Sequence, residues 1–344
     1  MRLLLRAASG LGRQCCQAGH RRTYAASPSP PPSILAAIKA HPPKVIRDYL
    51  TPMPSHLLAT TLSDLLPTTP SPSSPVVASP PRLLPPGHHL VYFPIQLPPS
   101  ALVPDGADPH HSPGPPFTRR VWAGGEVAFA GGLPLDGRAV VCRERVEDVH
   151  VRGAEGHEKV FVDVWRRYGL GHEDVEARQE WEITERRTLV FMREQEASSN
   201  SYTNPDSSLS PDPHPASHSV SLTPSPTHLF HFSALSFNAH AIHLDPLYAR
   251  DVDGHRALLV HGPLTLALML RVLSDHLGEG ARVRRFTYRN HAPLYVNERM
   301  TISLRKISGI GETQGRWDVW VEGPEGGLAV KGTAEVVPAE DITV

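Results

Sequence analysis

The chain has little cysteine, almost no net charge and no long apolar run. Its three cysteines form no Cys-x-x-Cys pair and no Cys/His zinc spacing, so neither a disulfide framework nor a metal site is expected. The formal net charge of -1 excludes a strongly basic surface for nucleic acid. No apolar run reaches the roughly 18 residues that a membrane-spanning helix needs, so no membrane insertion is expected.

Proline, by contrast, is abundant and unevenly distributed, with 36 prolines in 344 residues. Because proline lacks the backbone N–H that helices and sheets use, Pro-rich stretches are expected as linkers or surface insertions. They cover residues 28–32, 67–86, 94–116 and 205–226. Many histidines lie in or beside these stretches and are expected to be solvated: His88, His89, His110, His111, His214 and His218.

Residues 1–24 are rich in arginine and leucine, and the first acidic residue of the chain is Asp48. An Arg-rich amphipathic leader without acids is typical of a mitochondrial transit peptide, and Arg22-Thr23-Tyr24 resembles a matrix-protease cleavage step. The sequence therefore predicts a protein of the mitochondrial matrix. The alternative is an ordinary disordered basic tail.

The first half of the remaining chain, residues 33–196, reads as helix followed by antiparallel strands. Apolar residues recur at helical spacing within residues 33–66. Strand-like runs separated mostly by turn residues follow near 90–93, 121–122, 127–129, 139–142, 160–165 and 189–191. Residues 197–227 are polar and Pro-rich, which predicts a disordered linker or insertion.

The second half, residues 228–344, repeats that order. A short helical turn is expected over 246–252 and a long helix over 263–277, with Pro263 at its first turn and Gly278 at its end. Strand-like runs follow near 286–288, 300–304, 317–321 and 328–330. The predicted fold class is α+β, with two antiparallel sheets that each wrap a central helix.

One polar cluster stands out, just before the long helix of the second half. Asn238, His240, His243 and Asp245 precede a Gly-Pro step that opens the helix at Gly262. Histidines beside a helix N-terminus can transfer protons next to a polarised carbonyl. The alternatives are structural: Asn238 and His240 as turn caps, His243 as a buried hydrogen-bonded histidine, and Asp245 as a helix start.

These residues resemble a known family. Residues 237–245, Phe-Asn-Ala-His-Ala-Ile-His-Leu-Asp, resemble the motif of the MaoC-like (R)-specific enoyl-thioester hydratases. Residues 260–263, Val-His-Gly-Pro, resemble that family's step into the central helix, and residues 120–126 resemble a step in the N-terminal unit of its double hot-dog members. Among them, the type 2 hydroxyacyl-thioester dehydratases of fungal mitochondria are most similar.

The resemblance implies a division of roles within the motif. His243 matches the catalytic histidine and is expected to act as base and acid, while the Gly262 backbone N–H polarises the thioester carbonyl. The family has Asp where this chain has Asn238, which can only hold the hydroxyl or water by hydrogen bonds. His240 stands in place of the family's Asn and is the candidate for the missing titrating group. His240 and His261 are both expected near substrate.

The function implied is dehydration of (3R)-3-hydroxyacyl thioesters, or the reverse hydration, in mitochondrial type II fatty acid synthesis. The expected partners are an acyl-ACP or acyl-CoA thioester and acyl carrier protein, without cofactor or metal, in a homodimer or a pseudo-dimeric monomer. One alternative is a mesaconyl-type CoA hydratase of organic acid catabolism, which would need cations near the acyl pocket, such as Arg284 and Arg285. Others are a non-catalytic acyl-thioester-binding protein and, more weakly, a thioesterase.

Overall fold

The computed structural model describes residues 32–66, 75–173, 175–193, 210–309, 311 and 313–339. The predicted leader at 1–24 and residues 197–209 of the predicted linker lie outside these ranges. The helices are α1 (Pro32–Lys39), α2 (Pro52–Leu65), α3 (Pro226–Ser236), α4 (Pro246–Asp251) and α5 (Gly262–Leu277), with short 3-10 turns that include η1 (His88–Val91), η2 (Pro99–Ala101), η3 (Pro109–His111) and η6 (Ala241–His243).

Ten strands follow two runs of the chain. The first run is β1 (Lys44–Tyr49), β2 (Arg119–Phe129), β3 (Ala139–Arg152), β4 (Lys159–Leu170) and β5 (Ile183–Met192). The second is β6 (His218–Leu222), β7 (Ala281–Asn290), β8 (Met300–Ser308), β9 (Gly315–Glu322) and β10 (Leu328–Pro338).

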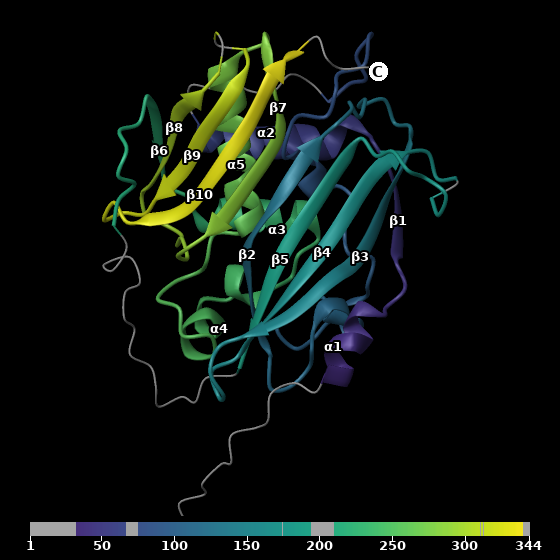
Figure 1. Ribbon diagram of the computed structural model, residues 1–344, viewed down its shortest axis with the longest axis vertical. Coiled ribbons are helices and arrows are strands. Elements are labelled where there is room, and N and C mark those ends of the chain that lie inside the picture. Colours follow the sequence, from purple (N-terminus) through teal and green to yellow (C-terminus); the bar gives the residue numbers. More distant parts are fainter. Residues whose placement is uncertain are drawn as a thin grey trace, which may run out of the picture.

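The strands form one continuous antiparallel sheet rather than the two separate sheets predicted. Its order is β1-β3-β4-β5-β2-β7-β10-β9-β8-β6, so each run of the chain occupies one half of the sheet (Figure 1). The halves join where β2 pairs with β7, for example Val127 with Phe286. Pairing two edge strands satisfies backbone groups that each half alone would expose, which explains the merger.

The junction of the halves also explains a glycine pair. Gly124 and Gly125 lie inside β2, at an irregularity between Trp122 and Gly124, and not in a turn between the predicted strand-like runs at 121–122 and 127–129. Gly124 has a φ of +150°, and a Cβ on it would lie 2.4 Å from the carbonyl oxygen of Tyr288 in β7. Glycine therefore allows the two halves to approach at this point.

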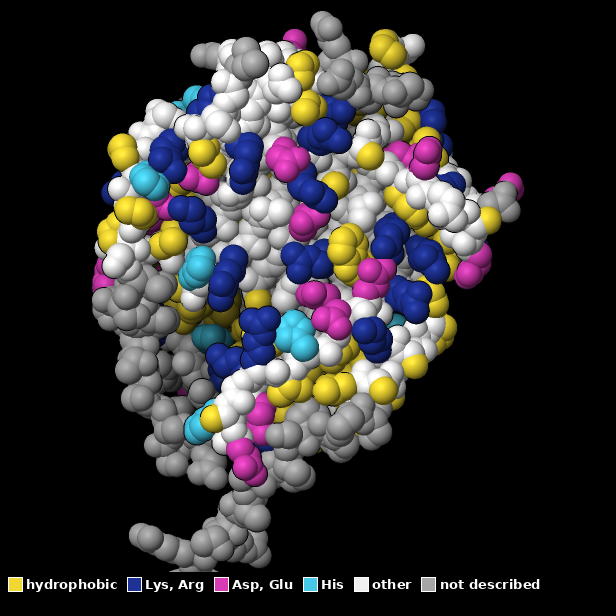
Figure 2. Space-filling model, in the orientation of Figure 1, with side chains coloured by type: hydrophobic (Ala, Val, Ile, Leu, Met, Phe, Trp, Pro, Cys, Tyr) yellow, Lys and Arg dark blue, Asp and Glu magenta, His cyan; other side chains and the backbone are white. Residues whose placement is uncertain are grey.

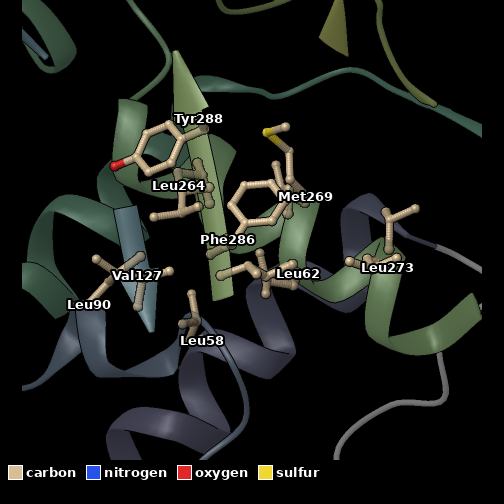
Figure 3. Close-up of a cluster of buried hydrophobic side chains, with 14 of the residues drawn as sticks. Leu58, Leu62, Leu90, Val127, Leu264, Met269, Leu273, Phe286 and Tyr288 are labelled. Carbon is tan, nitrogen blue, oxygen red and sulfur yellow. The ribbon is translucent and has the colours of Figure 1, made fainter. Parts of the chain in front are cut away.

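The central helices bury their apolar side chains against this junction. Figure 3 shows Leu58 and Leu62 of α2 close to Leu264 and Met269 of α5, with Phe286 of β7 beside them. All of these side chains are buried. Each buried leucine contributes about 1.5–3 kcal/mol relative to an exposed one, so the shared core fixes the helices on one face of the sheet.

Most predicted elements are confirmed, and the failures have local causes. The helices near 246–252 and 263–277 and the strands of the second half are present. Residues 90–93 form 3-10 turn η1 and its exit rather than a strand, because Phe93 has a positive φ and Pro94 follows it. Within the helical region predicted at 33–66, residues 44–49 instead pair with β3 as β1.

The predicted disordered linker at 197–227 is wrong for its last part. Residues 218–222 form edge strand β6, which pairs with β8 and buries Leu222. Helix α3 begins at Pro226 and was not predicted; Ser225 and His228 close a capping box at its start. The polar composition of this stretch hid an edge strand, where alternate side chains face water.

Candidate active site

A cavity of about 820 Å³ lies between the two halves of the sheet. The N-terminal half lines it with Tyr92, Phe93 and Trp122, among others, and the C-terminal half adds the polar cluster predicted from the sequence. Figure 2 shows a hollow in the sheet side of the molecule, where hydrophobic and histidine side chains lie beside Lys and Arg. Concave sites with apolar walls and a few polar groups are the usual form of ligand sites.

The polar cluster sits on the short connection between α3 and α4. Helix α3 ends with Phe237 in a left-handed conformation, which turns the chain sharply toward the cavity. The side-chain oxygen of Asn238 accepts a 3.0 Å hydrogen bond from the His240 backbone N–H. Asn238, His240 and His243 all line the cavity, while Asp245 caps α4 through the backbone N–H groups of Leu247 and Tyr248.

His243 is held in one tautomer. Its Nδ1 lies 2.8 Å from the carbonyl oxygen of Leu259, and because a carbonyl only accepts, Nδ1 carries the proton. The other ring nitrogen, Nε2, is therefore free to accept a proton. Burial, followed by the charges of His261 and His240, lowers the pKa of His243 well below its ordinary value. The ring is thus neutral at physiological pH and able to act as a base.

His261 is not among the residues that line the cavity, and its predicted contact with substrate stays a prediction. It is fully buried, its ring stacks on His243 with centroids 3.7 Å apart, and its Nε2 lies 2.9 Å from the Ser233 hydroxyl. Burial is the main cause that lowers the pKa of His261 to about 3. His261 therefore supports the His243 ring from behind.

Gly262 is the first residue of α5 and lines the cavity. A Cβ on it would lie 3.4 Å from both Trp122 and Asn290, which themselves line the cavity. The first N–H groups of a helix lack intrahelical acceptors and carry the positive end of the helix dipole. This end of α5 can therefore polarise a carbonyl oxygen bound beside Gly262.

His240 contacts a residue that the sequence analysis missed, Asp105. The His240 Nε2 lies 3.3 Å from Asp105 Oδ2, and both side chains are buried. Asp105 belongs to the Pro-rich stretch 94–116, which was predicted to be a linker or surface insertion. The only local signal was the Asp105-Gly106 turn pair, which says nothing about a distant histidine.

The opposite wall of the cavity carries a buried ionic network of the N-terminal half. The Nε of Arg166 lies 3.1 Å from Glu144, which also contacts His111 at 3.1 Å. Arg187 lies 2.8 Å from Glu185, which contacts the Tyr168 hydroxyl as well. Despite burial, these cations and histidines hold the pKa values of Glu144 and Glu185 well below the ordinary range, so both carboxylates are charged.

Two further expectations are corrected by burial and position. His88, His89 and His111 are buried rather than solvated, because η1 and η3 fold onto the core and the ionic network. Arg284 and Arg285 do not line this cavity; they are exposed on β7, where Arg285 pairs with Glu126 at 2.9 Å. Both can be exposed although they are consecutive, because the pairing of β7 with β10 is irregular here and skips Arg284, which interrupts the alternation of side-chain directions.

The described residues hold no group of three or more His, Cys, Asp or Glu placed to bind a metal ion. Cys142 is buried and unpaired. Within the same described part of the chain, no helix is both long enough and apolar enough to span a membrane.

Solved structures share this architecture. The MaoC-like dehydratase of Phytophthora capsici superposes with a TM-score of 0.60 at 14% identity, over 87% of this chain and 96% of that one. The full-length peroxisomal multifunctional enzyme type 2 of Drosophila melanogaster gives a TM-score of 0.55 at 14% identity, over 85% of this chain and 48% of that one. At such identities the likeness shows the fold alone, which is α+β and hot-dog-like.

Characterised proteins are also similar in sequence. The mitochondrial hydroxyacyl-thioester dehydratase type 2 of Schizosaccharomyces pombe is 27% identical, over 77% of this chain and 91% of its own length. A mesaconyl-C(4)-CoA hydratase of Chloroflexus aurantiacus is 28% identical, over 78% of this chain and 88% of its own.

The sequence model of one family, described as hydroxyacyl-thioester dehydratase type 2, matches residues 87–296, which is more than half of the chain. That range contains most of the residues that line the cavity and the whole polar cluster of the α3–α4 connection. An acyl thioester is the substrate that this family implies. The chain therefore belongs to the hydroxyacyl-thioester dehydratase type 2 family and is a hydro-lyase.

Proposed function

We propose that this protein interconverts (3R)-3-hydroxyacyl and trans-2-enoyl thioesters on acyl carrier protein, in mitochondrial type II fatty acid synthesis. The observation that carries the reaction is the geometry of His243, which lines the cavity and whose Nδ1 is bound to a carbonyl, so that Nε2 is the nitrogen able to accept a proton. The predicted leader at 1–24 and the name of the Schizosaccharomyces pombe relative support the mitochondrial matrix as its location.

In the dehydration direction His243 is the base. Its Nε2 takes the proton from C2, and the electron pair of that bond moves toward the thioester carbonyl. The backbone N–H of Gly262 stabilises the negative charge that develops on the carbonyl oxygen, aided by the dipole of α5.

The 3-hydroxyl then leaves as water, with the C3–O electron pair, while the C2=C3 double bond forms. That step requires a proton donor, because hydroxide is a poor leaving group. Asn238 cannot supply a proton at neutral pH, and its side-chain oxygen is engaged with the His240 backbone. Its amide NH₂ group supports a role in holding the hydroxyl, as the sequence motif predicts.

We also propose that the two halves are two hot-dog units, residues 33–196 and 228–344, the second extended by edge strand β6 at 218–222, combined in one pseudo-dimeric monomer. Each half contributes one long helix and five neighbouring strands of the sheet. The C-terminal unit carries His240 and His243, and the N-terminal unit lines the rest of the cavity.

The charges of the cavity wall favour a substrate whose acyl group carries no charge. Two buried cations of the cavity wall already have a carboxylate, since Arg166 pairs with Glu144 and Arg187 pairs with Glu185. A free carboxylate of a dicarboxylyl substrate would have to compete with these acids for the same guanidinium groups. The similarity to a mesaconyl-C(4)-CoA hydratase keeps that substrate as the second candidate.

The direct test is hydration of trans-2-enoyl thioesters of several chain lengths on acyl carrier protein and on CoA, with mesaconyl-CoA for comparison. Uncharged enoyl groups should be hydrated, and His243→Ala should abolish the reaction. His157→Ala, an exposed histidine of a hairpin, is the matched control and should retain full activity. Faster turnover of mesaconyl-CoA would replace the proposed substrate, and binding without any turnover would favour a non-catalytic role.

The location is tested separately. Residues 1–31 fused to a fluorescent protein should direct it to mitochondria, and replacing the five arginines of the leader with glutamine should leave it in the cytosol. A fusion that stays cytosolic with the intact leader would contradict the matrix assignment without affecting the proposed reaction.

A further inference from the structure

We propose that Asp105 and His240 form the second acid–base pair of the active site, in which the N-terminal half supplies the carboxylate that the motif of the C-terminal half lacks at Asn238. In this arrangement His240 is the catalytic acid and Asp105 is its positioning residue. The inference rests on the proposed dehydratase function and adds the proton donor that this reaction requires.

The segment that carries Asp105 is built into the active site. The Asp105 carbonyl oxygen accepts a 2.7 Å hydrogen bond from the backbone N–H of Ala241, inside the catalytic motif. The next residue, Gly106, has a φ of +80°, and a Cβ on it would lie 2.1 Å from the Ala239 carbonyl oxygen. No other residue fits there without moving the motif, so the backbone of the insertion fixes the position of the carboxylate.

The side chains complete the contact. Asp105 Oδ1 accepts a 2.8 Å hydrogen bond from the Ala107 N–H, which orients the carboxylate, and Oδ2 lies 3.3 Å from His240 Nε2. The Asp105 side chain is 11% exposed and that of His240 is 5% exposed. Such burial raises the pKa of a carboxyl, yet His240, the Ala107 N–H and Arg120 hold the pKa of Asp105 below its ordinary value, so it stays charged.

A buried carboxylate beside one ring nitrogen accepts a hydrogen bond from its N–H and fixes the orientation of the ring. Because Nε2 is bound to Asp105, Nδ1 is the nitrogen left for the cavity that His240 lines. The rings of His240 and His243 stand perpendicular, with centroids 5.7 Å apart. At this separation His243 can act on the C2 proton while His240 acts on the 3-hydroxyl of the same substrate.

The proton balance of the reaction then closes. His243 takes the C2 proton, and the C2–H electrons form the double bond as the C3–O bond breaks. His240 gives its proton to the departing oxygen, which leaves as water. The site ends with His243 protonated and His240 neutral, and proton exchange through solvent restores the starting state.

Other charged and titratable groups surround His240 and contribute to its electrostatic environment. They come from the 94–116 insertion, from β2 and from the segments around α4 and α5: Asp105, Arg119, Arg120, His243, Asp253, His255 and His261. Among these, Asp105 is the carboxylate that contacts the His240 ring directly.

The test compares Asp105→Asn with wild type across pH. Asn keeps the shape and removes the charge, so kcat should fall about 10- to 100-fold with little change in KM. The alkaline limb of the rate profile, where the acid loses its proton, should move to lower pH by about one unit or more. Asp105→Glu keeps the carboxylate and should recover part of the rate, whereas His240→Gln should lose at least as much as Asp105→Asn.

Asp318→Asn is the matched control. Its carboxylate side chain is similarly buried, at 9% exposed, and pairs with Arg305 outside the cavity lining. This variant should keep both the wild-type kcat and the wild-type pH profile. If both variants lose thermal stability but only Asp105→Asn loses kcat, the loss of activity comes from acid catalysis and not from unfolding.

A readout without turnover separates this inference from the proposed function. The ring nitrogen NMR signals of His240, identified by their absence in His240→Gln, should show the protonated ring persisting to higher pH in wild type than in Asp105→Asn. Inactivity of wild type on every enoyl thioester would reject the dehydratase proposal while this shift still reports the pair. Unchanged NMR signals and an unchanged rate profile in Asp105→Asn would overturn the inference.

Discussion

The two halves of the sheet have the same arrangement of helix and strands, but they contribute different kinds of side chain to the cavity. Each has one long helix and five neighbouring strands, yet the predicted catalytic motif lies in the C-terminal half, and of the two long helices only α5 begins with a glycine. The N-terminal half faces the cavity with paired charges, Arg166 with Glu144 and Arg187 with Glu185. Buried charges that satisfy one another hold structure, whereas a histidine with a free ring nitrogen can transfer protons.

Under the proposed mechanism neither half is complete alone. The C-terminal motif lacks a carboxylate at Asn238, and the acid nearest to His240 comes from the N-terminal insertion. A degenerate half can therefore remain essential by closing the cavity and by supplying one side chain. The predictions below separate the structural role of the N-terminal half from the chemical role of the C-terminal half.

The largest effect is expected from the ionic network of the N-terminal half. Glu185→Gln leaves Arg187 buried without its carboxylate, which should lower the free energy of unfolding by roughly 3–5 kcal/mol. Glu126→Gln is the matched control, because its pair with Arg285 is partly exposed and should contribute less than about 1 kcal/mol. Urea unfolding measures both. Equal losses of unfolding free energy in the two variants would show that the buried network stabilises the fold no more than a surface ion pair does.

The next prediction contrasts a buried histidine from each half. His243→Ala should lower kcat/KM by roughly 10²- to 10³-fold, because the base is lost. His89→Ala removes a ring that lies 3.5 Å from Glu185 and does not line the cavity, so it should lower stability while the folded enzyme keeps its kcat. Kinetics normalised to the folded fraction measure this contrast, and a large loss of kcat in His89→Ala would extend the chemistry into the N-terminal half.

Acid should destabilise both halves through their buried histidines. Burial and the charges of Arg271 and His89 lower the pKa of His88 to about 3, and burial and His240 lower that of His261 to about 3. The unfolded chain binds protons at these sites below about pH 6.5 and the folded chain does not, so stability is full above that pH and falls as pH decreases toward 3. Each histidine should contribute about 1.4 kcal/mol per pH unit in this window.

Unfolding at pH 7.5, 6 and 5 checks this expectation. His88→Gln in the N-terminal half and His261→Gln in the C-terminal half should each flatten the pH dependence by a similar amount. A slope that changes for only one variant would mean that the two halves do not share this origin of acid sensitivity.

The smallest effect is expected at the start of α5. Gly262→Ala adds a Cβ at 3.4 Å from Trp122 and Asn290, an ordinary contact, so stability should change by less than about 1 kcal/mol. The added methyl group occupies space beside the carbonyl site, which should raise KM a few-fold. Pro52, at the start of α2, is the counterpart in the other half. Pro52→Ala should leave KM unchanged, and an equal rise would argue against a special role for Gly262.

Much of the fold follows from local patterns. The helix at Gly262–Leu277 has proline at its start, glycine after its end and an apolar surface nearly all round, so its burial was predictable. Strand β1 and helix α3 were not predicted. Residues 44–49 become a strand because β3 offers them a partner, and such pairing is not recorded in six residues of sequence.

The site was predictable only as far as it is local. His240, His243 and Gly262 lie within one stretch of the chain, and all three line the cavity. His261 lies in the same stretch but packs behind His243, because its ring contacts the buried side chains of Ser233 and Phe232. Asp105 was missed because the Pro-rich composition around it suggested a surface insertion.

The sequence by itself determined the family motif, the helix that opens at Gly262 and the antiparallel character of most strands, because each depends on residues close together in the chain. Only the tertiary structure decided that the halves share one sheet, that the His243 ring is buried and neutral, and that Asp105 contacts His240. These features arise from contacts between distant segments, whose energies depend on burial and distance rather than on sequence spacing.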